Sequence, residues 1–253
     1  MRWSRRRQAT PDAAPPDAAP PVEPERQGDT AAYDELRAGF TAAVSHELRT
    51  PLARLLALLE SADLPGTDSA EVIAGARREV EQMRELVDEI LFLSELETGR
   101  QVVSLGETPV YPVLRDVQHA LAVNADHAAV VIRVAGDESL TVPVRERMLH
   151  AIVENLATNA VRYAGSGATI ELSVERKPGA VVLTVADDGA GVSADDLPRI
   201  FERFYRADRA RASRGTGLGL AIVKHVVTAA GGEVTAEGAP GRGLTIRCRF
   251  PAS

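Results

Sequence analysis

Two helical patterns of apolar residues in the first hundred positions constrain the fold more than any other feature of this chain. Leucines at spacings of four, three and four residues mark the first pattern: Leu48, Leu52, Leu55 and Leu59. After a connector with Pro65 and Gly66, apolar residues on one helix face mark the second: Val80, Met83, Val87 and Ile90, with Leu86 and Leu93 beside them. These spacings predict helices over 30–62 and about 70–98, and Gly99 is a typical residue to end the second helix.

The apolar residues cover more than one narrow stripe on each of these predicted helices. A single helical pair would therefore leave part of the apolar surface in contact with water. Two such hairpins that join in a four-helix bundle would bury it. We therefore expect residues 31–100 to form a homodimer through a four-helix bundle.

Beyond Gly99 the periodicity changes to a mixture of strands and helices. Alternating patterns of the antiparallel type predict short strands over 129–134, 168–174, 180–186, 233–236 and 244–250. Helical patterns lie before and between them, over 112–126, 144–163 and 219–230. Residues 101–253 are therefore expected to form a second domain, an α/β sandwich of the α+β kind with helices on one face of a sheet.

Composition excludes several classes of protein. Residues 9–24 are dominated by alanine and proline, so residues 1–30 are predicted to be a disordered tail. A net charge of −7 argues against nucleic acid as the main ligand, because such ligands select a basic face. The one cysteine, Cys248, cannot form an internal disulfide and is expected to fill the core of a cytoplasmic protein.

No apolar run reaches the roughly 20 residues that cross a bilayer. No apolar stretch follows the basic start Met1–Arg7 either, so we expect neither a transmembrane segment nor a signal peptide. No domain that would sense a stimulus is recognisable, so any input is expected from a separate sensor protein or from the other half of a divided receptor.

Residues 45–52 read Ser-His-Glu-Leu-Arg-Thr-Pro-Leu, within the first predicted helix. Because Pro51 has no N–H, the carbonyl group of Glu47 loses its helical partner and the helix should bend beside His46. A neutral imidazole, the form that a pKa of about 6.5 allows in the cytosol, can attack a phosphate through its free ring nitrogen. Glu47 can accept the proton on the other ring nitrogen. His46 is therefore a candidate phosphate acceptor.

The predicted helix over 144–163 carries polar residues near its end. Asn159 supplies a neutral carbonyl oxygen, a hard ligand of the kind that Mg²⁺ prefers. Asn155 lies one helical turn earlier on the same face. Arg162 can meet phosphate charge, and Tyr163 can lie along a nucleotide. These four residues predict one wall of a nucleotide site.

Glycine-rich segments follow at two later places. Asp187 comes at the end of a predicted strand, and its carboxylate can accept a hydrogen bond from the exocyclic amino group of adenine. Gly189 and Gly191 would let the backbone approach the nucleotide closely. Residues 215–220 read Gly-Thr-Gly-Leu-Gly-Leu and open the helix over 219–230. The amide groups of Gly215, Thr216, Gly217, Leu218 and Gly219 would face phosphate at a helix N-terminus.

Together these motifs resemble the sensor histidine kinases of two-component signalling, over roughly Asp34 to Phe250. The resemblance implies that His46 is the phospho-acceptor, that Glu47 is its base, and that Thr50 orients water when the response regulator is dephosphorylated. It also implies ATP and Mg²⁺ as cofactors, with Asn159 as the metal ligand.

The second half resembles the ATPase superfamily of histidine kinases, DNA gyrase, mismatch-repair and heat-shock chaperone proteins. Residues 201–206 are similar to the phenylalanine box of the kinases, which implies a mobile lid over 193–214 with Arg203 as a phosphate contact. Hydrolysing members of the superfamily place a glutamate four residues before the metal asparagine. Asn155 occupies that position here, so direct hydrolysis of ATP is not expected.

The resemblance implies a protein-histidine kinase that phosphorylates His46 and passes the phosphoryl group to an aspartate of a response regulator receiver domain, with dephosphorylation of the regulator as a second activity. Two other hypotheses stay open. One is a dimeric adaptor, non-catalytic or mainly phosphatase, that uses nucleotide only as a conformational ligand. The other is a serine kinase that acts on an anti-sigma-type partner, which would have no need of residues 40–100.

Overall fold

A computed structural model describes residues 25–62, 64–65, 67–97, 106–207 and 215–252 of the chain. The predicted tail up to residue 24, Gly99 and residues 208–214 of the predicted lid lie outside the described residues. Contacts define two compact units, Met1–Ala42 and Ala43–Ser253. Across the described part, no helix is both long and apolar enough to span a membrane.

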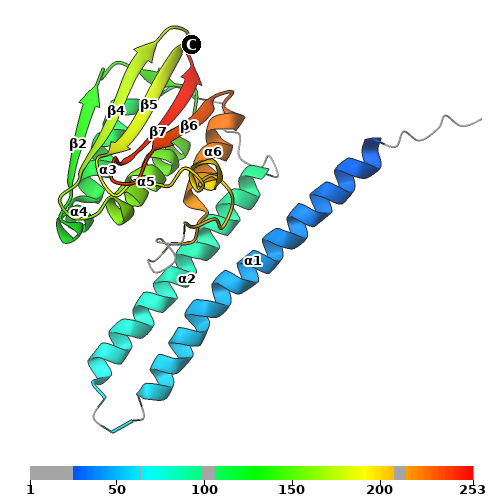
Figure 1. Ribbon diagram of the computed structural model, residues 1–253, viewed down its shortest axis with the longest axis vertical. Coiled ribbons are helices and arrows are strands. Elements are labelled where there is room, and N and C mark those ends of the chain that lie inside the picture. Colours follow the sequence, from blue (N-terminus) through cyan, green and yellow to red (C-terminus); the bar gives the residue numbers. More distant parts are fainter. Residues whose placement is uncertain (1–24, 63, 66, 98–105, 208–214, 253) are drawn as a thin grey trace, which may run out of the picture. The chain divides into compact units, whose positions relative to one another are not determined.

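The two predicted helices of the first hundred residues are present (Figure 1). Helix α1 spans Glu25–Ser61 and therefore begins inside the segment that was predicted to be tail. Helix α2 spans Ser69–Glu97, and the side chain of Asp68 accepts a hydrogen bond from the Ala70 amide at 2.8 Å in its first turn. A Cβ atom on Gly75 would lie 3.1 Å from Leu58 Cδ1, so glycine lets α2 pack closely against α1.

The second domain is built on a mixed five-stranded sheet with the order β2-β4-β5-β7-β6. Its strands are β2 Val131–Gly136, β4 Thr169–Lys177, β5 Ala180–Asp187, β6 Glu233–Gly238 and β7 Leu244–Pro251. The expectation of purely antiparallel strands was wrong for one pair, because β2 and β4 are parallel. The chain crosses over through helix α5 between these two strands, and such a connection returns it in the same direction.

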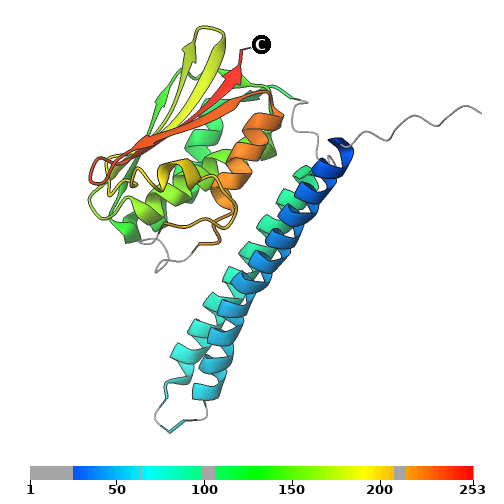
Figure 2. The ribbon, with the colours of Figure 1, turned by 45° about the vertical axis from the view of Figure 1, so that its right-hand side comes forward.

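Helices cover one face of this sheet (Figures 1 and 2). They are α3 Val110–Ala120, α4 Ala122–Ala128, α5 Glu146–Tyr163 and α6 Gly219–Ala229. The single helix predicted over 112–126 is two helices, because the backbone at Leu121 leaves the helical region between α3 and α4. A short pair of strands, β1 Thr108–Pro109 and β3 Thr141–Val142, was not predicted.

The core lies between the sheet and the helices. Alternate residues of β7 point into it, namely Leu244, Ile246, Cys248 and Phe250. Ile152, Val153 and Leu156 of α5 are also buried. Cys248 is fully buried, and this burial raises the pKa of its thiol to about 12. The prediction that Cys248 fills the core is confirmed.

Candidate functional site

His46 is presented to solvent on α1. Its side chain is 74% exposed, and its Nδ1 lies 3.4 Å from Oε1 of Glu47. The contact between these adjacent residues depends on their rotamers, and the structure shows the rotamers that allow it. With the Nδ1 proton held by the carboxylate, Nε2 is the nitrogen left with a free lone pair. The arrangement suits a nucleophilic imidazole.

The next helical turn contains Pro51, which is buried within α1 and cannot donate to the carbonyl group of Glu47. The bend expected beside His46 stays a prediction. Thr50 donates its hydroxyl to the carbonyl oxygen of His46 at 3.5 Å, the limit for a hydrogen bond. Thr50 is exposed, so its hydroxyl is also within reach of solvent on the His46 face of the helix.

A cavity of about 1130 Å³ lies beside α5. Pockets for ligands of drug size typically measure about 300–1000 Å³, so this one has room for a nucleotide. It brings together most of the residues predicted for the nucleotide site: Asn155, Asn159, Arg162, Tyr163, Asp187, Gly191, Gly215, Thr216, Gly217 and Gly219. Residues that lie more than sixty positions apart in the sequence therefore face one space.

The remaining predicted residues support the cavity from behind or lie outside its lining. Gly189 donates its amide to Asp187 Oδ1 at 2.9 Å, and a Cβ atom at this glycine would lie 2.1 Å from the Ala164 carbonyl oxygen. Leu218 is completely buried beneath the glycine segment. Arg203 is exposed and outside the lining, whereas Arg206 lies on it. The phosphate contact of Arg203 stays a prediction.

Asp187 combines partial burial with backbone donors. Burial raises the pKa of its carboxyl group above the ordinary value, while the amides of Gly189 and Leu244 oppose this by donating hydrogen bonds, and the charge of Asp188 adds to the rise. The neighbouring Asp188 is exposed and accepts the Thr169 amide at 2.7 Å. Of these two carboxylates, only Asp187 lines the cavity.

The glycine segment 215–219 fits closely against its surroundings. A Cβ atom on Gly215 would lie 2.8 Å from Arg162 Nη1 and 3.0 Å from the Tyr163 hydroxyl. A Cβ atom on Gly219 would lie 2.4 Å from Asn155 Oδ1. The absence of side chains at these positions therefore lets α5 and the start of α6 form adjoining walls of the cavity.

Thr216 adds a polar contact within the glycine segment. Its Oγ1 accepts the Leu218 amide at 3.2 Å and donates to the carboxylate of Glu89 in α2. Burial raises the pKa of Glu89, and the Thr216 hydrogen bond opposes this rise. The Thr216 hydroxyl therefore stabilises the loop before α6 by two hydrogen bonds, one with the backbone two residues later and one with α2.

The turn between β6 and β7 completes the cavity and was missed in the sequence. The amide of Gly243 donates to the Gly189 carbonyl at 3.0 Å, and that of Gly241 donates to the Ala190 carbonyl at 2.8 Å. A Cβ atom on Gly243, whose φ is +74°, would lie 1.8 Å from the Asp187 carbonyl oxygen. The signal was the glycine-rich stretch 238–243 between two predicted strands.

The donor set of the cavity suits a nucleotide that carries its own metal ion. Among residues 25–62, 64–65, 67–97, 106–207 and 215–252, no group of three or more histidine, cysteine or acidic side chains could hold a metal ion. Mg²⁺ commonly takes only one or two protein ligands and completes its shell with phosphate and water oxygens. One asparagine oxygen beside glycine amides fits that pattern.

Two domain families match the chain. The His Kinase A (phospho-acceptor) domain matches residues 36–99. The histidine kinase-, DNA gyrase B- and HSP90-like ATPase domain matches residues 144–253. The first match contains His46 and its neighbours, and the second contains the predicted nucleotide-binding residues. The exact limits predicted for the two domains, 31–100 and 101–253, stay predictions.

Individual proteins match across both domains. The sensor-like histidine kinase SenX3 of Mycobacterium tuberculosis is 33% identical over 232 residues, which cover 89% of this chain and 56% of SenX3. The histidine-protein kinase BaeS of Escherichia coli is 34% identical over 220 residues, 86% of this chain and 47% of BaeS. The solved structure of full-length ShkA in complex with AMPPNP is 30% identical, covers 92% of this chain and 47% of that one, and has a TM-score of 0.61. The chain spans about half the length of the curated relatives it matches.

Proposed function

The chain belongs to the sensor histidine kinases of two-component signalling, and from this premise we propose that it transfers the γ-phosphoryl group of ATP to Nε2 of His46. One observation carries the proposal: a single chain presents an exposed imidazole, with a carboxylate on its Nδ1, and a cavity on which Asn159, Asp187 and the glycine segment converge. The first feature accepts a phosphoryl group, and the second holds its donor.

The cavity would bind ATP through its adenine base and through its phosphates. The Asp187 carboxylate accepts the adenine amino group, while Gly191 and the β6–β7 turn let the backbone approach the base. Gly215, Thr216, Gly217 and Gly219 face the phosphates at the N-terminus of α6, where backbone amides and the helix dipole favour negative charge. The AMPPNP bound to ShkA supports an adenine nucleotide in this place.

The charged and polar residues on α5 would serve the phosphates. Arg162 lies beside Gly215 and meets the phosphate charge, and Tyr163 lies along the nucleotide. Asn159 would hold the Mg²⁺ ion that accompanies ATP, and such an ion would supply positive charge against the phosphate oxygens. Asn155 keeps α6 close, because its Oδ1 lies against Gly219.

In the transfer, the lone pair of His46 Nε2 attacks the γ-phosphorus atom. A phosphorus–nitrogen bond forms, the bond to the bridging oxygen breaks, and ADP leaves with that electron pair. As positive charge develops on the ring, the Glu47 carboxylate beside Nδ1 stabilises it and accepts the Nδ1 proton as a general base. The exposed phosphohistidine can then pass its phosphoryl group to an aspartate of a response regulator receiver domain, and Thr50 would orient water when the regulator is dephosphorylated.

We propose further that the hairpin of α1 and α2 pairs with a second copy. Residues at spacings of seven line an exposed face of α2, namely Ile73, Val80 and Val87, which are 54%, 51% and 41% exposed. Exposed leucines of α1 add to this surface: Leu52, Leu56 and Leu59. Val72, Leu86 and Leu93 are buried already, so the hairpin has a second apolar stripe beyond its own seam, as a four-helix bundle needs.

The use of ATP with Mg²⁺ supports action in the cytoplasm, where this nucleotide is found. The kinase hypothesis is tested by incubation with γ-labelled ATP and Mg²⁺. Acid-labile, alkali-stable label on the wild type that is absent from His46→Gln supports it. His127→Gln, a change at an exposed histidine of α4, is the matched control and should retain the label.

Nucleotide binding without label would instead indicate the adaptor, and label on a serine of a partner would indicate the serine kinase. Either result would overturn the proposed phosphorylation of His46.

A further inference from the structure

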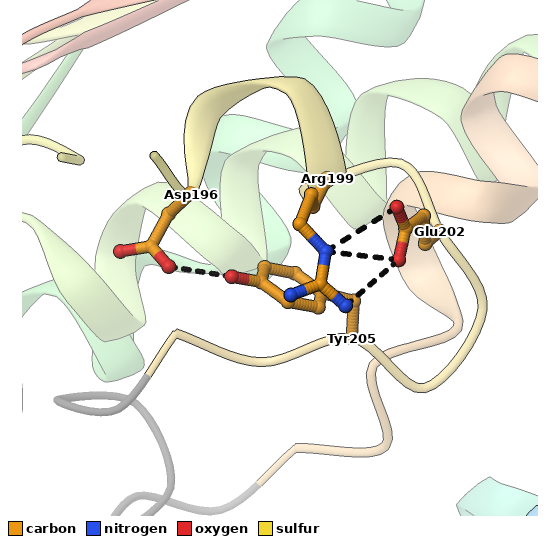
Figure 3. A network of polar contacts seen from close by, with 4 residues as sticks. All are labelled: Asp196, Arg199, Glu202 and Tyr205. Atoms are coloured by element: carbon orange, nitrogen blue, oxygen red, sulfur yellow. Dashed lines mark hydrogen bonds and ion pairs between the residues drawn. The ribbon is translucent and has the colours of Figure 1, made fainter. Parts of the chain in front are cut away.

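Tyr205 lies at the centre of a polar network on the wall of the nucleotide cavity (Figure 3). Its hydroxyl donates to Asp196 Oδ1 at 2.5 Å, and the guanidinium carbon of Arg199 lies 4.2 Å from the centre of its ring. Arg199 also pairs with Glu202 at 3.2 Å. The tyrosine is therefore held at its hydroxyl end by Asp196, directly before the short helix η1 (Leu197–Arg199), and over its ring face by Arg199, the last residue of that helix.

The hydroxyl end of Tyr205 is tied to the loop that follows Asp187. The other oxygen of Asp196, Oδ2, accepts the Ser193 hydroxyl at 2.6 Å, and Ser193 in turn accepts the Asp196 amide at 3.2 Å. Ser193, Asp196 and Tyr205 all line the cavity. The network therefore connects the segment 201–206 to the side of the cavity that carries the Asp187 carboxylate.

The residue before Tyr205 is tied to the opposite side of the cavity. Phe204 donates its amide to the Gly217 carbonyl at 2.9 Å. A Cβ atom on Gly217 would lie 2.8 Å from the Cα of Phe204, so the two backbones are in direct contact. Phe204 has a φ of +60°, a left-handed conformation that a bulky residue keeps only when its surroundings enforce it.

We propose that Tyr205 is a positioning residue for ATP. Its bond to Asp196 and its contact with Arg199 hold the segment 201–206 against Gly217, and so they fix the shape of the glycine segment before the phosphates arrive. They also keep Arg206 on the cavity wall. The inference rests on the proposed function, because it assigns the phosphates of ATP to this side of the cavity.

Tyr205→Phe tests the proposal, since it removes one hydroxyl group and leaves the ring under Arg199. Loss of one hydrogen bond to a carboxylate typically changes an equilibrium by about tenfold or more. We expect the KM for ATP in phosphorylation of His46 to rise about tenfold while kcat stays within about twofold, because the loop is ordered in the step in which ATP binds and remains ordered during transfer. Tyr111→Phe on α3, outside the cavity lining, is the matched control and should leave both constants unchanged.

Changes at Asp196 separate positioning from packing. Asp196→Ala should raise KM at least as much as Tyr205→Phe, and adding Tyr205→Phe to it should have no further effect, because the bond is already lost. Asp196→Asn keeps one oxygen to accept the tyrosine hydroxyl but turns the bond into a neutral one, so KM should rise less than in Asp196→Ala. A fall in kcat at constant KM, additive effects of the two changes, or an unchanged KM in Tyr205→Phe would each overturn the proposal.

Calorimetry with AMPPNP distinguishes this failure from failure of the proposed function. If the wild type binds AMPPNP but does not label His46, the kinase assignment fails, while the ratio of Kd values between Tyr205→Phe and wild type still tests the positioning role. A Kd weakened about tenfold at an unchanged melting temperature of the nucleotide-free protein supports it. Equal Kd values refute it.

Discussion

Asp187 is the residue whose replacement should separate nucleotide recognition from folding. In Asp187→Asn the group keeps its size but loses its charge. The carboxylate now accepts the Gly189 amide through Oδ1 and still has oxygen lone pairs for the adenine amino group. The single oxygen of asparagine is needed to accept the backbone amides, so its NH₂ group would face the adenine amino group. Both of these groups are hydrogen-bond donors, so the bond to adenine would be lost.

The size of the effect follows from the kind of bond that is lost. A hydrogen bond to a charged group contributes about 1.5–3 kcal/mol, which corresponds to about 10- to 150-fold in Kd. We expect Asp187→Asn to weaken ATP binding by at least the lower figure, measured by calorimetry on the full chain. Phosphorylation of His46 at an ATP concentration well below the wild-type KM should fall in proportion.

The nucleotide-free protein should respond in the opposite direction. Burial raises the pKa of Asp187, so the protonated form is favoured in the folded state, and the stability that this group contributes is lost as pH rises through the folded pKa. At neutral pH the ionised carboxyl group therefore costs stability. Asparagine removes this cost, so the melting temperature without nucleotide should be equal or higher.

Asp188→Asn is the matched control for this change. Asp188 is exposed, and asparagine can still accept the Thr169 amide, so ATP binding should stay within about twofold of the wild type, the size of ordinary surface effects. Two results would contradict this reasoning. One is a Kd for ATP in Asp187→Asn equal to that of the wild type, and the other is weaker binding together with a lower melting temperature of the nucleotide-free variant.

Three other predictions concern the glycine segment, the core and the bundle. Gly217→Ala should impair ATP binding and, in denaturant titrations, lower the unfolding free energy by more than Gly241→Ala. Both glycines have φ above +70°, but a Cβ atom at Gly217 would lie 2.8 Å from the backbone of Phe204, whereas one at Gly241 would meet no atom of a described residue within 4 Å. The thiol of Cys248, with its pKa raised to about 12 by burial, should react with a thiol reagent only after unfolding, as followed by absorbance with and without denaturant. Val80→Glu places a charge on the exposed stripe of α2 and should shift the protein from dimer to monomer in sedimentation experiments.

Local patterns in the sequence were sufficient for most elements. The leucine spacing of α1 and the alternation in β7 are one-dimensional signals, and both elements are present where they were expected. The parallel pairing of β2 with β4 could not be predicted from the sequence of either strand, because the direction of a strand depends on the connection that precedes it. The break at Leu121 was missed for a similar reason, since the apolar period continues across it and only the backbone changes.

Site residues at the end of a strand or the start of a helix were easier to predict than site residues whose role depends on the direction in which the side chain points. Glycines that precede a helix and a carboxylate that ends a strand have fixed places, and the cavity gathers them. Arg203 and Arg206 belong to the same short motif, and nothing in the sequence shows which arginine faces the cavity. The structure distinguishes them, because Phe204 adopts a left-handed backbone that turns the chain between them.

The wall formed by α5 also bears on the fate of the phosphoryl group. Hydrolysis requires a base beside the attacking water, and the residue four positions before Asn159 is Asn155. Its amide donates to the Ala151 carbonyl at 2.7 Å, and its oxygen lies against Gly219, so this side chain is committed to the packing of α5 on α6 and has no carboxylate to take a proton. Glu154 also lines the cavity, but adjacent helical residues point about 100° apart, so it does not occupy the direction that Asn155 occupies. A nucleophile that needs no base on α5 is the consistent acceptor, and the imidazole of His46, whose Nδ1 already lies beside the Glu47 carboxylate, meets that requirement.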